Sequence, residues 1–540
     1  MSNLTQSISP QQLKSALSDG HEIALLDVRE HGQYGEGHPF FSVNCPFSSL
    51  EYQAPLLVPC RATRVVVFDD EDEGVARRAA ESLRALGYGN LSVLDGGAQG
   101  WKAAGFELFK GVNVPSKAFG EMVEHDMGTP SVSAKELNEM IRRGENIVIL
   151  DGRSPGEYTR MNIPTARSCP NAELGYRIDG LAPDPDTKVI INCAGRTRSI
   201  IGAQTLISLG IANRVAALRN GTQGWQLSDL TLDYSNSPDP HPPLGARDLA
   251  KVRARAAAFA RANGVPFVSP ETLENWRADE GRSTYLFDVR TEQEYRAGHL
   301  PGACHAAGGQ LVQATDHWVA TRHARIVLCC DLGPRAVTSC YWLRAMGHDA
   351  FVLDLDVAAL AEPETGPAPA WAPALTSRLP RLTPEDFATA RTAETVLVDA
   401  SSGESYRKSH IAGALWAIRP RLQGLQAYLG RPIVVCGDES RASLLAADLL
   451  AAGHRDVRLL EGGVPAWKAA GLSIESSPDL PPDEEMIDFL IYVHDRQSGS
   501  LESARKYLEW ETGLIAQMDD QERAVFSTGP FVSKAMEHSE

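Results

Sequence analysis

The chain has 540 residues, a formal net charge of −17 and 43% hydrophobic residues, a balance ordinary for a globular protein of several domains. Binding to nucleic acid or to an anionic membrane relies on clustered lysine and arginine, so the acidic charge argues against both as partners. Its nine cysteines do not suit a small disulfide scaffold, and no Cys-x-x-Cys spacing indicates a metal site. The N-terminal residues lack a basic and then apolar segment, and no run approaches about 20 apolar residues, so we expect a cytoplasmic protein.

One pattern recurs four times along the chain: an apolar run ending in Asp-x-Arg, then a tyrosine, then Gly-His. The second copy has Asn162 in place of the histidine, and the fourth copy is weakened to Asp399-Ala400-Ser401. A loop position follows the aspartate by 42 residues in the first three copies and by 37 in the fourth. The aspartates and loop positions are Asp27 with Asp69, Asp151 with Cys193, Asp288 with Cys330, and Asp399 with Cys436. Such regularity indicates tandem copies of one domain.

The second copy shows the expected structure of each domain. Its apolar runs at residues 147–150 and 189–191 predict strands, and residues 134–142 and 199–209 predict helices. Alternation of this kind predicts an α/β domain with a parallel sheet flanked by helices and with function at the carboxyl ends of the strands. Cys193 is therefore expected between the end of a strand and the start of a helix.

The loop that contains Cys193 is suited to a thiolate. Helix N-termini and nearby cations lower the pKa of a cysteine thiol from its usual value of about 8.5. Ala194 and Gly195 allow the backbone N–H groups to turn toward an anion. Arg196 and Arg198 add two positive charges to a loop that has no acidic residue. We expect a nucleophilic cysteine that handles an anionic substrate or intermediate.

These residues resemble the rhodanese family of sulfurtransferases, through the Cys193 loop, Leu150 to Arg153 with Glu157 and Tyr158, and the closing stretch Asn220 to Trp225. The resemblance implies four tandem rhodanese-like domains and a partly helical C-terminal tail. It also implies that sulfur from thiosulfate or a low-molecular-weight persulfide is carried on Cys193 to a thiol, cyanide or protein acceptor, without metal or organic cofactor. The residues expected to bind the substrate are Ala194, Gly195, Arg196, Thr197, Arg198, Ser199 and Arg153. For Arg153, a structural ion pair with Glu157 is the favoured alternative.

The other three copies have different loops. In the first copy, Asp69 to Gly74 contains five carboxylates and no cysteine, so we expect an inactive domain. The third and fourth copies keep Cys330 with Arg335 and Cys436 with Arg441, but the loop charge falls to 0 and −1. Carboxylates raise the pKa of a thiol and repel an anionic donor. Cys330 and Cys436 are therefore secondary catalytic candidates.

Proline-rich and polar stretches give the expected boundaries. These are a first domain at 1–112, a second at 130–235, a linker helix at 236–266, a third domain at 267–362, a fourth at 380–476, and a tail at 477–540. The linker helix is expected to be a strut between domains. A helix predicted over residues 501–518 of the tail either covers a domain edge or makes a homodimer contact.

The cysteine loops distinguish sulfur transfer from other activities of the same fold. Phosphatases and arsenate reductases of the same fold use a Cys-x5-Arg loop, whereas all three cysteine loops here are Cys-x4-Arg, a tighter cradle suited to one sulfur atom. The Cys-Gly-Ser-Gly-Val loop usual in mercaptopyruvate sulfurtransferases is absent. The alternative from another class is a non-enzymatic persulfide carrier or scaffold, which the degenerate first copy suits.

Overall fold

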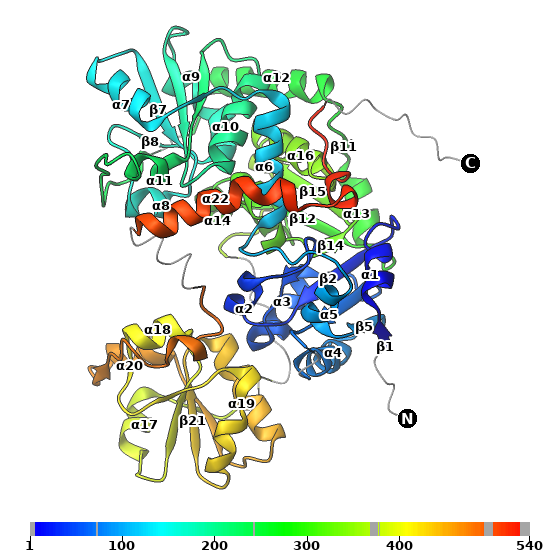
Figure 1. The fold of residues 1–540 in the computed structure, drawn as a ribbon, viewed down its shortest axis with the longest axis vertical. Helices are drawn as coiled ribbons and strands as arrows, with labels where there is room; N and C mark the ends of the chain where they lie inside the picture. Colours follow the sequence, from blue (N-terminus) through cyan, green and yellow to red (C-terminus); the bar gives the residue numbers. More distant parts are fainter. Residues whose placement is uncertain are drawn as a thin grey trace. The chain divides into compact units, whose positions relative to one another are not determined.

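The computed structural model describes residues 6–71, 74–240, 243–367, 376, 378–490 and 500–529 (Figure 1). They form two compact units. The first unit contains residues 6–17, 23–112, 376 and 378–490, and so holds the first and fourth domains. The second unit contains residues 18–22, 113–240, 243–367 and 500–529, and so holds the second and third domains with the tail helix. The two domains that share a unit are therefore not always neighbours in the chain: the first is grouped with the fourth, and the second with the third.

Each domain contributes five parallel strands in the same spatial order, which confirms the predicted α/β repeat. The orders are β1-β5-β4-β2-β3, β6-β10-β9-β7-β8, β11-β16-β15-β12-β13 and β17-β22-β21-β18-β20. Helices lie on both faces of the sheets, as Figure 1 shows around β7 and β21. The strand that leads to each loop position is the central one of its sheet. This places every loop at the carboxyl edge, where α/β domains bind their ligands.

The helices and strands of the first unit follow the pattern predicted from the repeat. In the first domain they are β1 (Gln6–Ile8), α1 (Pro10–Ala16), β2 (Ile23–Asp27), α2 (His31–Glu36), β3 (Val43–Asn44), α3 (Leu50–Leu57), β4 (Arg64–Phe68), α4 (Val75–Ala85), β5 (Leu91–Leu94) and α5 (Gly97–Ala103). In the fourth they are β17 (Arg381–Leu382), α17 (Pro384–Ala390), β18 (Val396–Asp399), α18 (Gly403–Lys408), β19 (His410–Ile411), β20 (Leu415–Trp416), β21 (Ile433–Cys436), α19 (Glu439–Ala451), β22 (Val457–Leu460), α20 (Gly463–Ala469) and β23 (Ile474–Glu475).

The second unit repeats this arrangement and adds helices outside the sheets. The helix α6 (Val114–Met127) precedes the second domain. In the second domain the elements are β6 (Ser131–Val132), α7 (Ala134–Arg142), β7 (Ile147–Asp151), α8 (Pro155–Arg160), β8 (Arg167–Ser168), α9 (Asn171–Leu181), β9 (Lys188–Asn192), α10 (Thr197–Ser208), β10 (Val215–Leu218) and α11 (Gly221–Gln226). The linker and third domain contain α12 (Ala246–Ala262), β11 (Phe267–Val268), α13 (Pro270–Arg277), β12 (Thr284–Asp288), α14 (Glu292–Ala297), β13 (Cys304–His305), α15 (Gly308–Gln313), β14 (Thr321–Arg322), β15 (Arg325–Cys330), α16 (Pro334–Ala345) and β16 (Asp349–Asp356). The tail contains α22 (Leu501–Gln517) and α23 (Asp520–Arg523).

The two domains of the second unit share one continuous apolar core, which begins at Phe119 on α6 and crosses β9, β15 and α16. Buried residues of the linker helix α12 pack against this core. Its Arg255 pairs with Asp179 of the second domain, and its Arg253 pairs with Asp356 of the third. The helix therefore joins the two domains, as the strut prediction expected.

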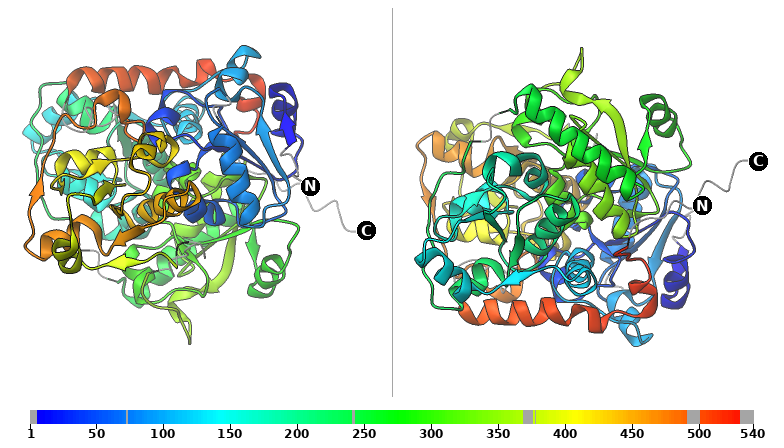
Figure 2. Two further views of the ribbon diagram at one scale, coloured as in Figure 1. Left: turned by 90° about the horizontal axis from the view of Figure 1, so that it is seen from below. Right: turned by 90° about the horizontal axis from the view of Figure 1, so that it is seen from above.

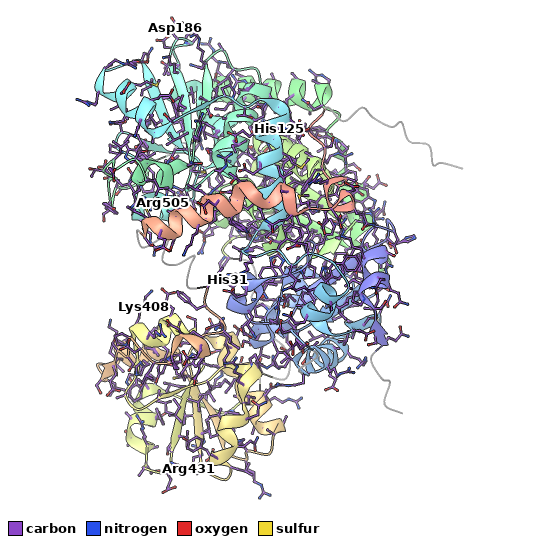
Figure 3. All side chains as sticks on the ribbon, viewed as in Figure 1. His31, His125, Asp186, Lys408, Arg431 and Arg505 are labelled. Atoms are coloured by element: carbon purple, nitrogen blue, oxygen red, sulfur yellow. The ribbon has the colours of Figure 1, made fainter. Side chains whose placement is uncertain are left out.

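The tail helix α22 packs across α6 and touches α11 (Figures 1 and 2). Its buried side carries Ala504, Tyr507, Leu508, Glu511 and Leu514, whereas Arg505 lies on the exposed side (Figure 3). Of the two roles expected for this helix, the structure shows it covering a domain of its own chain. Among the described residues, no helix is both long and apolar enough to cross a membrane.

Candidate active site

Cys193 directly follows β9, and three residues separate it from the start of α10, as predicted. Its side chain is 2% exposed. The thiol donates to Ser199 Oγ at 3.5 Å, and the Ser199 hydroxyl donates to the Arg196 carbonyl at 2.7 Å. The sulfur therefore lies within the curve of the 193–199 loop, beside the first turn of the helix. Backbone N–H groups at a helix start carry partial positive charge and suit an anionic sulfur.

The closing stretch Asn220 to Trp225 holds this loop from the other side. Thr222 N donates to the Cys193 carbonyl at 2.8 Å, and Gln223 N donates to the Ala194 carbonyl at 3.1 Å. Gly221 has a φ of +53°, and a Cβ there would lie 2.2 Å from the Cys193 oxygen. Only glycine fits this position without moving the loop. The stretch is thus a support for the cysteine loop.

Both loop arginines are paired with carboxylates. Arg198 makes two bonds of 2.7 Å to Glu157, and Arg196 binds Glu121 at 2.6 and 2.8 Å and also contacts Glu124. Burial opposes the charge on Arg198, but Glu157 outweighs burial and raises the pKa of that guanidinium. The pKa of Glu121 is raised to about 7. Burial is the main cause and the other nearby carboxylates add to it, whereas Arg196 acts in the opposite direction. The positive loop expected from the sequence is therefore locally neutralised.

Arg153 belongs to the frame of the domain. Its Nε donates to Asp151 at 2.9 Å and its Nη2 donates to the same carboxylate at 2.7 Å and to the Met161 carbonyl. The expected ion pair of Arg153 with Glu157 is wrong, because the aspartate that ends the strand binds the guanidinium within its own turn. Glu157 instead forms an ion pair with Arg198 and a capping box with Ser154 at the start of α8. The first and third domains contain the same Asp-x-Arg pair.

A buried carboxylate from the tail also contacts the loop. Glu511 on α22 is fully buried and accepts a hydrogen bond of 2.7 Å from Thr197 Oγ1. Its Oε1 also lies 3.4 Å from the Lys117 ammonium of α6. A Cβ added to Gly195 would lie 3.1 Å from both Glu511 and Tyr507, so the helix approaches the backbone of the loop closely. Sequence reasoning missed Glu121 and Glu511, because neither lies in a recurring motif.

The loop of the third domain is covered by the second domain. Asp331 accepts a 2.6 Å bond from the Tyr176 hydroxyl, and the fully buried Arg335 contacts Asp331, Glu173 and Glu294. The Cys330 thiol donates to the Gly333 carbonyl at 3.7 Å. Burial, followed by the charge of Asp331, raises the pKa of the Cys330 thiol to about 12. This loop serves as an interface between the paired domains.

The fourth domain has a glycine where the second has its cysteine. Asp151 of β7 pairs in register with Asn192, the residue before the loop cysteine. In the fourth domain Asp399 of β18 pairs in register with Cys436 itself, so the loop position belongs to Gly437. The prediction that Cys436 occupies that position is wrong by one residue. Burial, followed by the charge of Asp399, raises the pKa of the Cys436 thiol well above its usual value.

A second observation gives the same register. A Cβ on Gly463 would lie 2.6 Å from the Gly437 oxygen, just as one on Gly221 would lie 2.2 Å from the Cys193 oxygen. The supporting glycine therefore faces Gly437 in the fourth domain and Cys193 in the second. Cys436 is a core residue of its strand.

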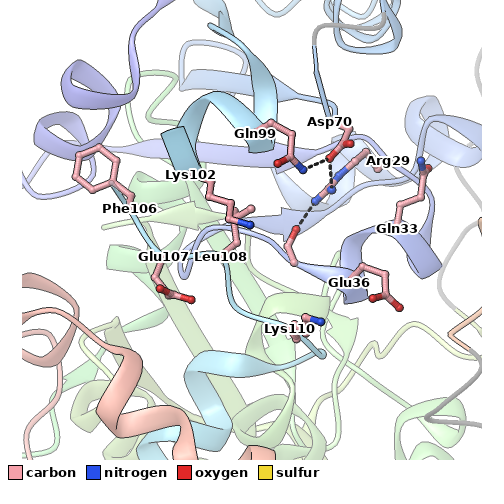
Figure 4. A pocket seen from close by; sticks show the side chains of 11 residues that line it. Arg29, Gln33, Glu36, Asp70, Gln99, Lys102, Phe106, Glu107, Leu108 and Lys110 are labelled. Atoms are coloured by element: carbon pink, nitrogen blue, oxygen red, sulfur yellow. Dashed lines mark hydrogen bonds and ion pairs between the residues drawn. The ribbon is translucent and has the colours of Figure 1, made fainter. Parts of the chain in front are cut away.

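The first domain has Asp69 at the loop position, where its carboxylate accepts a 3.0 Å bond from Ala76 N of α4. Asp72 and Glu73 of the acidic loop lie outside the described residues. A cavity of about 530 Å³ opens at the carboxyl edge of this sheet, with Arg29, Asp70 and Gln99 in contact on one side (Figure 4). None of the described residues that line it is a cysteine. The loop position of this domain is therefore occupied by a carboxylate in place of the cysteine thiol of the second domain.

Comparison with known proteins agrees with this geometry. A family model described as "Rhodanese-like domain" matches residues 9–104, 133–228, 269–362 and 383–470. A protein named thiosulfate sulfurtransferase from Pseudomonas aeruginosa is 25% identical over 236 residues, which cover 37% of this chain and 86% of that protein. One of the same name from Azotobacter vinelandii is 24% identical over 230 residues, which cover 36% of this chain and 83% of that protein.

Among solved structures, the crystal structure of a thiosulfate sulfurtransferase from Pseudomonas aeruginosa is similar over nearly the whole length. It is 40% identical, the match covers 96% of this chain and 99% of the other, and the TM-score is 0.90.

Proposed function

Because the chain belongs to the rhodanese-like domain family, we propose that it is a sulfurtransferase whose nucleophile is Cys193. The observation that carries the proposal is the position of this sulfur within the 193–199 loop, beside the first turn of α10. Thiosulfate is the donor suggested by the names of the similar proteins, and a low-molecular-weight persulfide is the second donor class. The acceptor is a thiol, cyanide or a protein thiol.

The reaction consists of two displacements. In the first, the Cys193 thiolate attacks the outer sulfur of the donor, the sulfur–sulfur bond of the donor breaks, and sulfite or a thiolate leaves with the bonding electrons. In the second, the acceptor thiolate attacks the outer sulfur of the Cys193 persulfide and regenerates the Cys193 thiolate. Backbone N–H groups of residues 194–199 supply oriented dipoles for the anionic sulfur in both steps. Neither displacement requires an external oxidant or reductant.

Cys330 and Cys436 have other roles in this proposal. The raised pKa of the Cys330 thiol leaves almost no thiolate near pH 7, and its loop is occupied by the contact with the second domain. Cys436 lies within a strand, one residue before the loop position.

All nine cysteines are free, which suits the reducing cytoplasm that we propose as the location of this protein.

The test is intact mass and turnover with thiosulfate and cyanide for the wild type and for Cys193→Ser, Cys330→Ser and Cys436→Ser. The expected result is a persulfide shift of about 32 Da that disappears only in Cys193→Ser, with turnover lost in the same variant. Substantial turnover in Cys193→Ser would place the chemistry elsewhere. Persulfide loading without turnover would favour a carrier of sulfur over an enzyme.

A further inference from the structure

Two helices that lie outside the four matched domains meet at the Cys193 loop. These are α6, between the first and second domains, and α22, in the tail. Both approach closely: a Cβ on Gly120 of α6 would lie 2.8 Å from Thr197 Cγ2, and one on Gly195 would lie 3.1 Å from Glu511 Oε2. They bring Glu121, Glu124 and Glu511 to the loop. The domain repeat itself supplies the Arg153–Asp151 and Arg198–Glu157 pairs, whose equivalents in the third domain are Arg290–Asp288 and Arg335–Glu294.

These carboxylates cancel the positive charge that the loop sequence suggests. Each cation around the loop already contacts a carboxylate, and the carboxylates outnumber the cations by five to four. The cations are Arg153, Arg196, Arg198 and Lys117, and the carboxylates are Asp151, Glu121, Glu124, Glu157 and Glu511. Glu511 Oε2 is buried and has no hydrogen-bond partner among the described residues. Because the pKa of Glu121 is raised to about 7, that carboxyl group is only partly ionised near neutral pH, and the charge of these described groups lies between zero and −1. A donor arriving at Cys193 therefore meets the backbone dipoles of the loop and the buried Glu511 carboxylate, with no net positive charge to attract a dianion.

We propose that α6 and α22 make the Cys193 site selective against doubly charged donors, with Glu511 as a specificity-determining residue. The favoured donor class is the persulfide of a low-molecular-weight thiol, which carries at most one negative charge on its sulfur, in preference to the thiosulfate dianion. This inference rests on the proposed sulfurtransferase function of Cys193. In the favoured reaction, the Cys193 thiolate attacks the outer sulfur of R–S–S–H, the donor S–S bond breaks, and R–S⁻ leaves with the electron pair. The transferred sulfur keeps its proton, so the products are the Cys193 persulfide Cys–S–S–H and the thiolate R–S⁻, and atoms and charge balance.

The charge of Glu511 predicts a different change in kcat/KM for each of the two donors. The repulsion between Glu511 and a donor scales with the charge of the donor. Replacing the carboxylate by the similarly shaped amide in Glu511→Gln keeps an oxygen that can accept from Thr197. The substitution should raise kcat/KM for thiosulfate on the order of tenfold and that for a singly charged persulfide at most about threefold. The logarithm of the first change is about twice that of the second.

The experiment measures kcat/KM for thiosulfate and for the persulfide of 2-mercaptoethanol on the full chain. Glu509→Gln is the matched control, because Glu509 is exposed on the same helix and the chemical change is identical. Glu124→Gln is the second charge variant. The Glu124 side chain is 26% exposed, so its loss is tolerated in folding even if Glu511→Gln is not. Both charge variants should shift the ratio of the two kcat/KM values toward thiosulfate, and the control should not.

Intact mass separates the outcomes. If the wild type prefers the persulfide and the charge variants shift the ratio toward thiosulfate, the inference stands. If Cys193 is loaded from both donors and the ratio is unchanged in Glu511→Gln and Glu124→Gln, the inference is overturned while the proposed function stands. If neither donor adds sulfur to Cys193, the proposed function fails and the inference fails with it.

Discussion

Replacing Gly221 by alanine tests whether the closing stretch sets the position of the cysteine loop. At a φ of +53°, an alanine costs about 1 to 2 kcal/mol from backbone strain alone. The new Cβ would also lie 2.2 Å from the Cys193 oxygen and 2.8 Å from the Gly195 oxygen. Relieving these contacts requires the loop to move by about 1 Å, a displacement that typically lowers a rate about 100-fold. We therefore expect persulfide loading to fall about 100-fold.

The matched control is Gly144→Ala. Gly144 has a φ of +65°, and a Cβ there would meet nothing within 4 Å. It shares the backbone strain and lacks the clash, so we expect a similar loss of stability in urea unfolding with normal loading of Cys193. Single-turnover loading followed by mass spectrometry measures the difference. Loading of Gly221→Ala at the rate of the control would refute the account of the closing stretch as a support.

Three further predictions concern pH and the contacts within each unit. The raised pKa of Glu121 favours its protonated form in the folded state, so its stabilising contribution is complete below about pH 4.5 and is lost as pH rises through about 7. Glu121→Gln should remove this fall, on the order of 3 kcal/mol, from the unfolding free energy measured between those pH values. Glu51→Ala should destabilise the first unit by about 3 kcal/mol in urea unfolding, because it removes a bidentate partner from the buried Arg419; an effect below about 1 kcal/mol would contradict this. Tyr176→Phe removes the hydroxyl that donates to Asp331 and should cost about 1 to 3 kcal/mol without changing the loading of Cys193, which mass spectrometry would show.

The sequence predicted the parts of the site that local patterns encode. The apolar run of β9, the loop and the following helix placed Cys193 correctly, because a strand and a helix start each have a short-range signature. The repeat itself revealed the four domains. Spacing alone misplaced Cys436, since the fourth copy is shorter and only the pairing of β18 with β21 settles the register.

The surroundings of the loop could not be predicted in this way. Glu121 lies 75 residues from Arg196, and Glu511 lies 314 residues from Thr197. Both come from helices whose apolar periodicity indicates burial but not the partner. A loop charge counted from neighbouring residues is therefore a poor guide to the electrostatics of a site when distant helices supply the counter-charges.

The pairing of the first domain with the fourth has a consequence for synthesis on the ribosome. The second and third domains, which are contiguous in sequence, can pair as soon as they emerge, whereas the first domain waits for the fourth. At about 5 to 20 residues per second, the intervening stretch delays that pairing by roughly tens of seconds. The helix that carries Glu511 emerges after all four domains. The chain therefore completes the surroundings of Cys193 only after its fourth domain has been made, long after the cysteine itself.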